Sequence, residues 1–253
     1  MKKMGLFLML AVGLSLVFIP LMGYGQDTII KDTAVFDKAY VPALFLTGQG
    51  KVEESKLSMK FLKEGWTTFT KKYYSAQPND VQWKKDMDKV EDLIMATDKT
   101  VAGEKDLPGA HEDLEGVRMI LMDARKRNKI EYFPDYLTEF HGYMEEIFDA
   151  ADKKKPETLS EKDIETIKEA LPDAIEAWDE AKKSKFNPEL YGFSPEQVGK
   201  MRNLQKTEED ALLALQEALK NGDKAEIIKH ALSLKPKFIP VYMLFGDFER
   251  LKK

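Results

Sequence analysis

Cysteine is absent from the sequence. This absence excludes disulfide bonds, zinc sites built on thiolates, thiol catalysis and iron–sulfur clusters. It also excludes covalent c-type haem, whose attachment requires a Cys-x-x-Cys-His motif, and a lipid anchor on an N-terminal cysteine. The folded chain must therefore be stabilised by the burial of side chains, without covalent cross-links.

Strongly basic segments are also lacking. The chain has 39 basic and 44 acidic residues, which gives a formal charge of −5, and the two signs are interspersed. Binding to nucleic-acid phosphates needs a concentrated positive surface, so no nucleic-acid partner is expected. The mildly acidic balance is ordinary for a soluble protein.

Recognisable catalytic and nucleotide-binding motifs are missing as well. The sequence contains no Gly-x-Ser-x-Gly, no phosphate-binding Gly-Lys-Ser/Thr loop and no His-Glu-x-x-His. His111-Glu112 begins like the last of these motifs, but Glu115 stands where its second histidine would be. We therefore expect a protein that is not an enzyme.

Residues 1–26 have the pattern of a secretory signal peptide. Lys2 and Lys3 precede an apolar run that continues to about Met22, and Gly23-Tyr24-Gly25 supplies the small residues that a signal peptidase recognises. An uncleaved anchor is the alternative, because a run of about 18 apolar residues approaches the length of a membrane span. We expect cleavage, a periplasmic or secreted location and no stable membrane insertion afterwards.

The rest of the chain has helical periodicity almost throughout, and no segment alternates as strands do. Short connections between the helices predict antiparallel neighbours. The expected fold class is all-α, an antiparallel helical bundle of about nine helices. The expected helices cover approximately 35–48, 62–73, 83–101, 110–124, 134–148, 161–178, 195–221, 223–234 and 236–248.

A short motif of an apolar residue, proline, any residue and two large apolar residues occurs three times, at 41–45, 133–137 and 239–243. It suggests two duplicated four-helix units, at about 30–130 and 131–234, with a last helix that begins a third copy. The expected domain bounds are residues 27–130 and 131–253, and the two units would pack as two domains or as one. If the units are duplicated, their interface is the natural place for a ligand. The alternative is that proline simply favours helix starts with aromatic first turns.

Three histidines are present, which narrows the search for a metal site. His111 and Glu115 lie four residues apart on one expected helix, and His141 and Glu145 repeat this spacing on the next. Two nitrogens and two carboxylates that faced each other would suit zinc or iron in a helical bundle. The spacing departs, however, from the Glu-x-x-His pattern of di-iron bundles.

The expected packing argues against a site shared by these four residues. If the turn between the two helices centres near residue 130, His111 lies level with about residue 150. At 1.5 Å per residue, His111 would then be offset from His141 by about 12 Å. We therefore expect His111 to be partly exposed and hydrogen-bonded, and His141 to be a hydrogen-bonded core residue.

Two further features bear on a cofactor or a buried charge. Twelve methionines leave open a non-covalent haem b held by a methionine and a histidine, although most of the methionines fall on core stripes.

Glu208 falls on the apolar face of its expected helix. A buried carboxylate must be paired, neutral or bound to metal, whereas one at the rim of a helix reaches water; we expect the rim position.

The sequence thus predicts an exported soluble protein of non-catalytic type, without a cofactor, that binds a protein partner or a small ligand or acts as a structural module. The alternative is a bundle that binds a transition metal or haem b through His111 or His141. A helical enzyme that combines Glu208 with a histidine is a third class, and it would need these groups to meet in one cleft.

Overall fold

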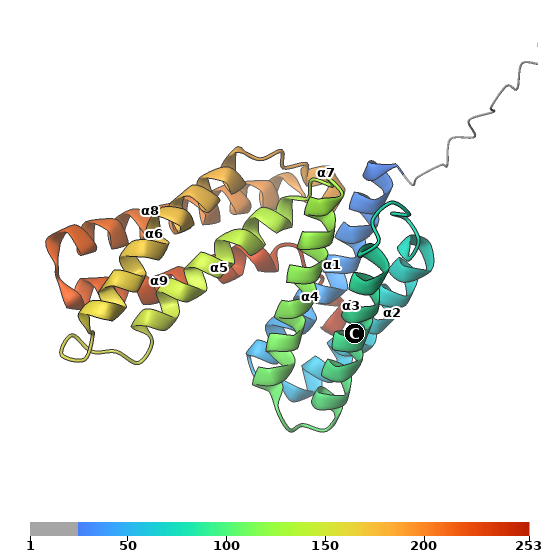
Figure 1. Cartoon of the computed structure of the whole chain (residues 1–253), viewed down its shortest axis with the longest axis horizontal. Helices are drawn as coiled ribbons and strands as arrows, with labels where there is room; N and C mark the ends of the chain where they lie inside the picture. Colours follow the sequence, from blue (N-terminus) through green and yellow to red (C-terminus); the bar gives the residue numbers. More distant parts are fainter. Residues whose placement is uncertain (1–24, 253) are drawn as a thin grey trace, which may run out of the picture.

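The structure, a computed structural model, describes residues 25–252, and every regular element in this range is a helix (Figure 1). The all-α bundle predicted from the periodicity is therefore confirmed. Most of the expected signal peptide, residues 1–24, lies outside the described residues. The elements are α1 (Gln26–Gly48), α2 (Val52–Tyr73), α3 (Trp83–Ala102), α4 (Leu107–Arg127), α5 (Phe133–Ala151), α6 (Glu161–Lys183), α7 (Pro188–Tyr191), α8 (Pro195–Asn221), α9 (Lys224–Met243) and the 3₁₀ helix η1 (Glu249–Lys252).

The long helices form two sets of four (Figure 1). In the first set, α1 packs on α2, α2 on α3 and α3 on α4, and α4 returns to α1. The second set repeats this order of neighbours with α5, α6, α8 and α9. An origin of the two sets by duplication stays a prediction. Between residues 25 and 252, no helix is both long enough and apolar enough to cross a bilayer.

Local signals in the sequence explain where the helices begin and end. Ser160 and Ser194 each form a capping box at the start of α6 and α8. Asp106 caps α4, because its carboxylate accepts a hydrogen bond of 2.9 Å from a backbone N–H of the first turn. Gly192 and Gly222 end α7 and α8 in the left-handed conformation that glycine adopts without strain.

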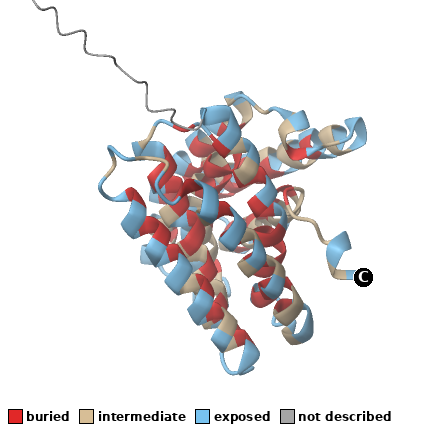
Figure 2. Cartoon of the chain, turned by 90° about the vertical axis from the view of Figure 1, so that its right-hand side faces the viewer, coloured by how far each residue is buried: buried red, intermediate tan, exposed pale blue. Residues whose placement is uncertain are grey.

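In the core of each set, a tryptophan packs against a phenylalanine of the preceding helix. Trp66 of α2 packs against Phe36 of α1 with ring centroids 5.6 Å apart, and Trp178 of α6 packs against Phe140 of α5 at 4.6 Å. All four side chains are buried. Figure 2 shows that the buried residues lie on the helix sides that face one another, as amphipathic stripes require.

The two helices expected after Asn221 are one continuous helix, α9, which runs through Pro236 and Pro240. Each proline removes one helical hydrogen bond. Leu234 and Phe238, on either side of Pro236, are buried in the core, and their burial on one continuous face offsets this loss. The described residues nevertheless contain nine α-helices, because the sequence did not predict the short helix α7.

A buried polar cluster joins the two sets beside the connection from α4 to α5. Arg125 of α4 donates two hydrogen bonds to Asp135 of α5, at 2.8 and 2.5 Å. Next to this pair, the Tyr132 hydroxyl donates to Asp37 of α1 at 2.6 Å. Burial raises the pKa of Asp37 to about 6, although Tyr132 and Arg125 act in the opposite direction. The cluster holds the beginning of α5 against the first set.

The C-terminal segment, residues 244–252, returns from the second set to α1. The backbone N–H of Asp247 donates a hydrogen bond of 2.9 Å to the carbonyl oxygen of Lys38. Gly246 lies so close to α1 that a Cβ atom at this position would be 2.9 Å from Pro42. The segment therefore ties the end of α9 to the first helix of the other set.

Candidate functional site

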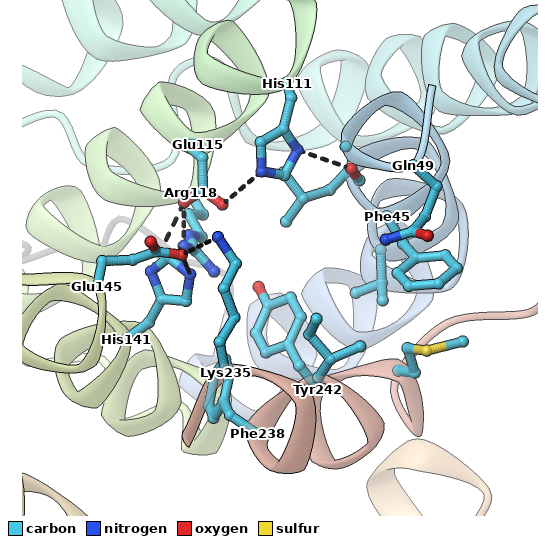
Figure 3. A pocket seen from close by; sticks show the side chains of 15 residues that line it. Phe45, Gln49, His111, Glu115, Arg118, His141, Glu145, Lys235, Phe238 and Tyr242 are labelled. Atoms are coloured by element: carbon cyan, nitrogen blue, oxygen red, sulfur yellow. Dashed lines mark hydrogen bonds and ion pairs between the residues drawn. The ribbon is translucent and has the colours of Figure 1, made fainter. Parts of the chain in front are cut away.

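A pocket with a cavity volume of about 160 Å³ lies where α1, α4, α5 and α9 meet (Figure 3). This place is the junction between the two helical sets. α1 and α9 supply an apolar wall. Its residues are Val41, Leu44, Phe45, Phe238, Ile239 and Met243. α4, α5 and α9 supply a polar wall. Its residues are His111, Glu115, Arg118, His141, Glu145, Lys235 and Tyr242.

The first polar group, His111 of α4, is oriented by α1. Its Nδ1 atom lies 2.9 Å from the carbonyl oxygen of Leu44. A carbonyl oxygen only accepts hydrogen bonds, so Nδ1 must carry a proton. The other ring nitrogen, Nε2, lies 3.5 Å from Oε1 of Glu115. Gly48 leaves room for the ring, because a Cβ atom there would be 2.9 Å from it.

Arg118 forms the centre of the polar wall and is 5% exposed. Its Nη2 atom pairs with Oε2 of Glu115 and lies 2.6 Å from Nδ1 of His141. The guanidinium also lies 5.5 Å from the ring centroid of Tyr242. Its Nε atom is buried and has no hydrogen-bond partner among the described residues. Arg118 therefore links the two helical sets and keeps one N–H unused.

His141 of α5 is held in a single tautomer. Arginine nitrogens only donate, so Nδ1 of His141 accepts from Arg118, and the ring proton lies on Nε2, 3.1 Å from Oε1 of Glu145. Burial, followed by the charge of Arg118, lowers the pKa of His141. His141 is therefore neutral at neutral pH and has a partner on both nitrogens.

Glu145 of α5 is the last residue in this series of contacts. It forms an ion pair with Lys235 of α9, whose Nζ atom lies 2.7 Å from Oε1 of Glu145. Burial raises the pKa of Glu145, but the hydrogen bonds from His141 and Lys235 outweigh burial and lower it to about 2. Glu145 is therefore ionised throughout the physiological pH range.

The hydroxyl group of Tyr242 points into the pocket (Figure 3). Burial raises the pKa of this hydroxyl group.

The structure brings all four residues of the predicted metal site, His111, Glu115, His141 and Glu145, into this one pocket. The expected register of α4 against α5 is wrong. α5 packs mainly on α6 and α9, and it diverges from α4 after their connection (Figure 1). The level of a residue along α4 consequently says little about its distance from α5.

The arrangement of these four residues does not suit a metal ion that all of them would share. Arg118, a cation, lies between Glu115 and His141, and both nitrogens of His141 already have partners. In the part of the chain that the structure describes, no three His, Asp or Glu residues are placed to hold a metal ion. His111 and His141 are hydrogen-bonded and partly buried.

No protein-family model, curated protein or solved structure matches this chain. The cavity itself limits what it can hold. Its volume is close to that of a known engineered cavity of about 150 Å³ that binds benzene. It therefore fits a molecule of about six to eight non-hydrogen atoms, with an apolar body on α1 and α9 and a polar head group on α4 and α5.

Three residues of the polar wall were not predicted from the sequence: Arg118, Lys235 and Tyr242. Arg118 had a usable signal, because it follows His111 by two helical turns and lies on the same stripe as Glu115. Lys235 and Tyr242 lie far along the chain, and no local pattern connects them with the histidines.

Glu208 of α8 lies outside the pocket, and its expected position at a helix rim is wrong. Its exposure is 0%, and neither carboxylate oxygen has a hydrogen-bond partner among the described residues. Burial raises the pKa of Glu208 to about 8, although Lys237 acts in the opposite direction. The third histidine, His230, is also outside the pocket and contacts Glu226 at 3.1 Å. Glu208 thus does not share the cleft that holds His111 and His141.

Proposed function

We propose that this chain is an exported, non-catalytic binding protein that holds a small, partly apolar molecule between its two helical sets. The observation that carries the proposal is the pocket, in which an apolar wall faces a fixed and largely buried polar wall. The polar groups are held by one another and by the backbone, so little reordering is needed when a ligand binds. The signal-peptide pattern of residues 1–26 supports export.

The composition of the pocket supports binding without catalysis. None of the residues that line it is serine, threonine or cysteine, and Lys235, which can also act as a nucleophile, is paired with Glu145. His141 has a fixed tautomer and no free lone pair for a substrate proton. The groups that remain, including Nε2 of His111, can donate or accept hydrogen bonds and so orient a ligand.

The metal or haem alternative has less support from the geometry. A metal that used His141 would have to displace either Arg118 or Glu145 from its ring. A haem macrocycle is far larger than a cavity of about 160 Å³. Metal analysis and an absorption spectrum of the purified protein test this alternative. One equivalent of metal or a Soret band, lost in His141→Ala, would replace our proposal.

Three probes with the same ring and different head groups test the binding proposal: benzyl alcohol, benzoate and benzylamine. Titration calorimetry should detect saturable one-to-one binding of at least one probe. Ile239→Phe places extra atoms in the cavity and should weaken that binding by about tenfold or more. Ile175→Phe, at a partly buried position on α6 outside the pocket, is the matched control and should leave binding unchanged.

Two results would refute the proposal. One is that none of the three probes binds. The other is that binding occurs but is equally strong in Ile239→Phe and in the unmodified protein, which would place the bound molecule elsewhere.

A further inference from the structure

We infer that the ligand carries an anionic head group of the carboxylate type, and that binding it places a proton on Nε2 of His111. The inference rests on the proposed function and specifies the ligand class for the same pocket. It follows from the hydrogen-bond donors of the polar wall, from its charge balance and from the different surroundings of its two histidines.

The polar wall has donors to spare. Lys235 has three N–H donors, and its contact with Glu145 uses one of them. The Tyr242 hydroxyl points into the cavity and can donate to an acceptor there (Figure 3). The Nε atom of Arg118 has no partner among the described residues. A head group that accepts hydrogen bonds satisfies these spare donors, which an ammonium group cannot do.

The charges of the wall are balanced before a ligand binds. Arg118 and Lys235 offset Glu115 and Glu145, and His141 is neutral. An incoming carboxylate would add one uncompensated negative charge to a largely buried site, which is unfavourable. Uptake of one proton by a group in the wall removes this excess.

Three of the four candidate groups on α4 and α5 are poor acceptors for that proton. Glu145 is strongly acidic, because His141 and Lys235 lower its pKa to about 2. A proton on Nδ1 of His141 would face the donor Nη2 of Arg118 at 2.6 Å. Protonation of Glu115 would sacrifice its ion pair with Arg118, a cation that is 5% exposed.

His111 is the group that remains. Its Nε2 atom has no proton in the neutral ring, because Nδ1 donates to the Leu44 carbonyl oxygen. A proton on Nε2 would be directed toward Glu115, 3.5 Å away. The other charged or titratable groups of the pocket come from α4, α5 and α9; they are Arg118, His141, Glu145, Lys235 and Tyr242. The imidazolium would then have a carboxylate on its own helix and the anionic head group in the cavity.

The test compares the three probes between pH 5.5 and pH 8, in two buffers with different heats of ionisation. At pH 6, benzoate should bind about tenfold more tightly than benzyl alcohol, because hydrogen bonds to charged groups are the strong ones. Benzylamine should bind most weakly. Benzoate binding should take up as much as one proton, and its advantage should decrease as the pH rises.

Variants and NMR identify the proton acceptor. His111→Gln should abolish the proton uptake. His230→Gln, which alters a histidine with the same four-residue spacing to a glutamate outside the pocket, should leave it unchanged. In the unmodified protein, benzoate should shift the ring nitrogens of His111 toward imidazolium values, a result that does not depend on any variant folding.

The possible failures are distinguishable. If benzyl alcohol binds as tightly as benzoate at every pH, the anionic head group is wrong and the pocket stands. If proton uptake persists in His111→Gln, or if the His111 nitrogens do not shift, the assignment of the proton to His111 is wrong. If no probe binds, the proposed function fails together with this inference.

Discussion

Replacing Glu208 with glutamine should stabilise the protein at neutral pH and have little effect near pH 5. Glutamine has nearly the same shape and removes only the ability to ionise. Glu208 is 0% exposed and its carboxylate oxygens have no partner in the described residues. The charged form is therefore strongly disfavoured in the folded state, while the unfolded chain ionises this side chain freely.

The sign and size of the effect follow from the two pKa values. Burial raises the pKa of Glu208 from 4.5 to about 8, so the folded state holds the proton more tightly than the unfolded state does. The stabilisation that results is complete below pH 4.5 and is lost as the pH rises through 8. At about 1.4 kcal/mol per pH unit, the loss between pH 5 and pH 7 is about 2 to 3 kcal/mol.

Urea unfolding at pH 5, 6, 7 and 8 measures this difference. The free energy of unfolding of Glu208→Gln should exceed that of the unmodified protein increasingly as the pH rises. Glu217→Gln, at an exposed position on the same helix, should follow the unmodified protein throughout. Parallel curves for the unmodified protein and Glu208→Gln would refute the reasoning, because they would mean that Glu208 is ionised or paired in the folded state.

Three further substitutions test the packing that holds the pocket together. Arg125→Met leaves the Asp135 carboxylate buried without its partner and should lower the free energy of unfolding, measured in urea, by about 3 to 5 kcal/mol. Adding Asp135→Leu should restore most of this stability, and a double variant as unstable as Arg125→Met would contradict this account. Gly246→Val forces a side chain against Pro42 and should cost about 1 to 3 kcal/mol, with faster proteolysis of the C-terminal segment. Ser160→Ala removes the capping box of α6 and should cost about 1 kcal/mol in thermal unfolding followed by circular dichroism.

Most of the helices were predictable because their signals are local. The apolar stripes, the caps at Ser160 and Ser194 and the glycine after α8 all act within a few residues. α9 was divided incorrectly at Pro236, where a local penalty is outweighed by burial of the neighbouring Phe238 in a core that the sequence does not display. Packing partners, in contrast to helix positions, depend on distant parts of the chain.

The candidate site was predictable in its residues and not in its geometry. Histidine is rare in this chain, so its spacing to glutamate stood out at His111 and His141. The angle between α4 and α5 is set by the buried pair of Arg125 and Asp135 and by the packing of α5 on α9, and these contacts are not encoded near the histidines. For Glu208, the sequence correctly indicates that the side chain lies on the apolar face of α8. The exposure of Glu208, however, depends on the neighbouring helices α6 and α9, which pack on α8.

The pocket is built from the first and last long helices of the described chain, α1 and α9, with α4 and α5 between them. No fragment that lacks either end can contain it. A chain that is still being synthesised, or that crosses a membrane in an unfolded state, therefore has no binding site. Such a protein would cross empty and acquire its ligand only after folding on the far side. The ligand would thus report on the composition of the destination compartment and not on that of the cytoplasm.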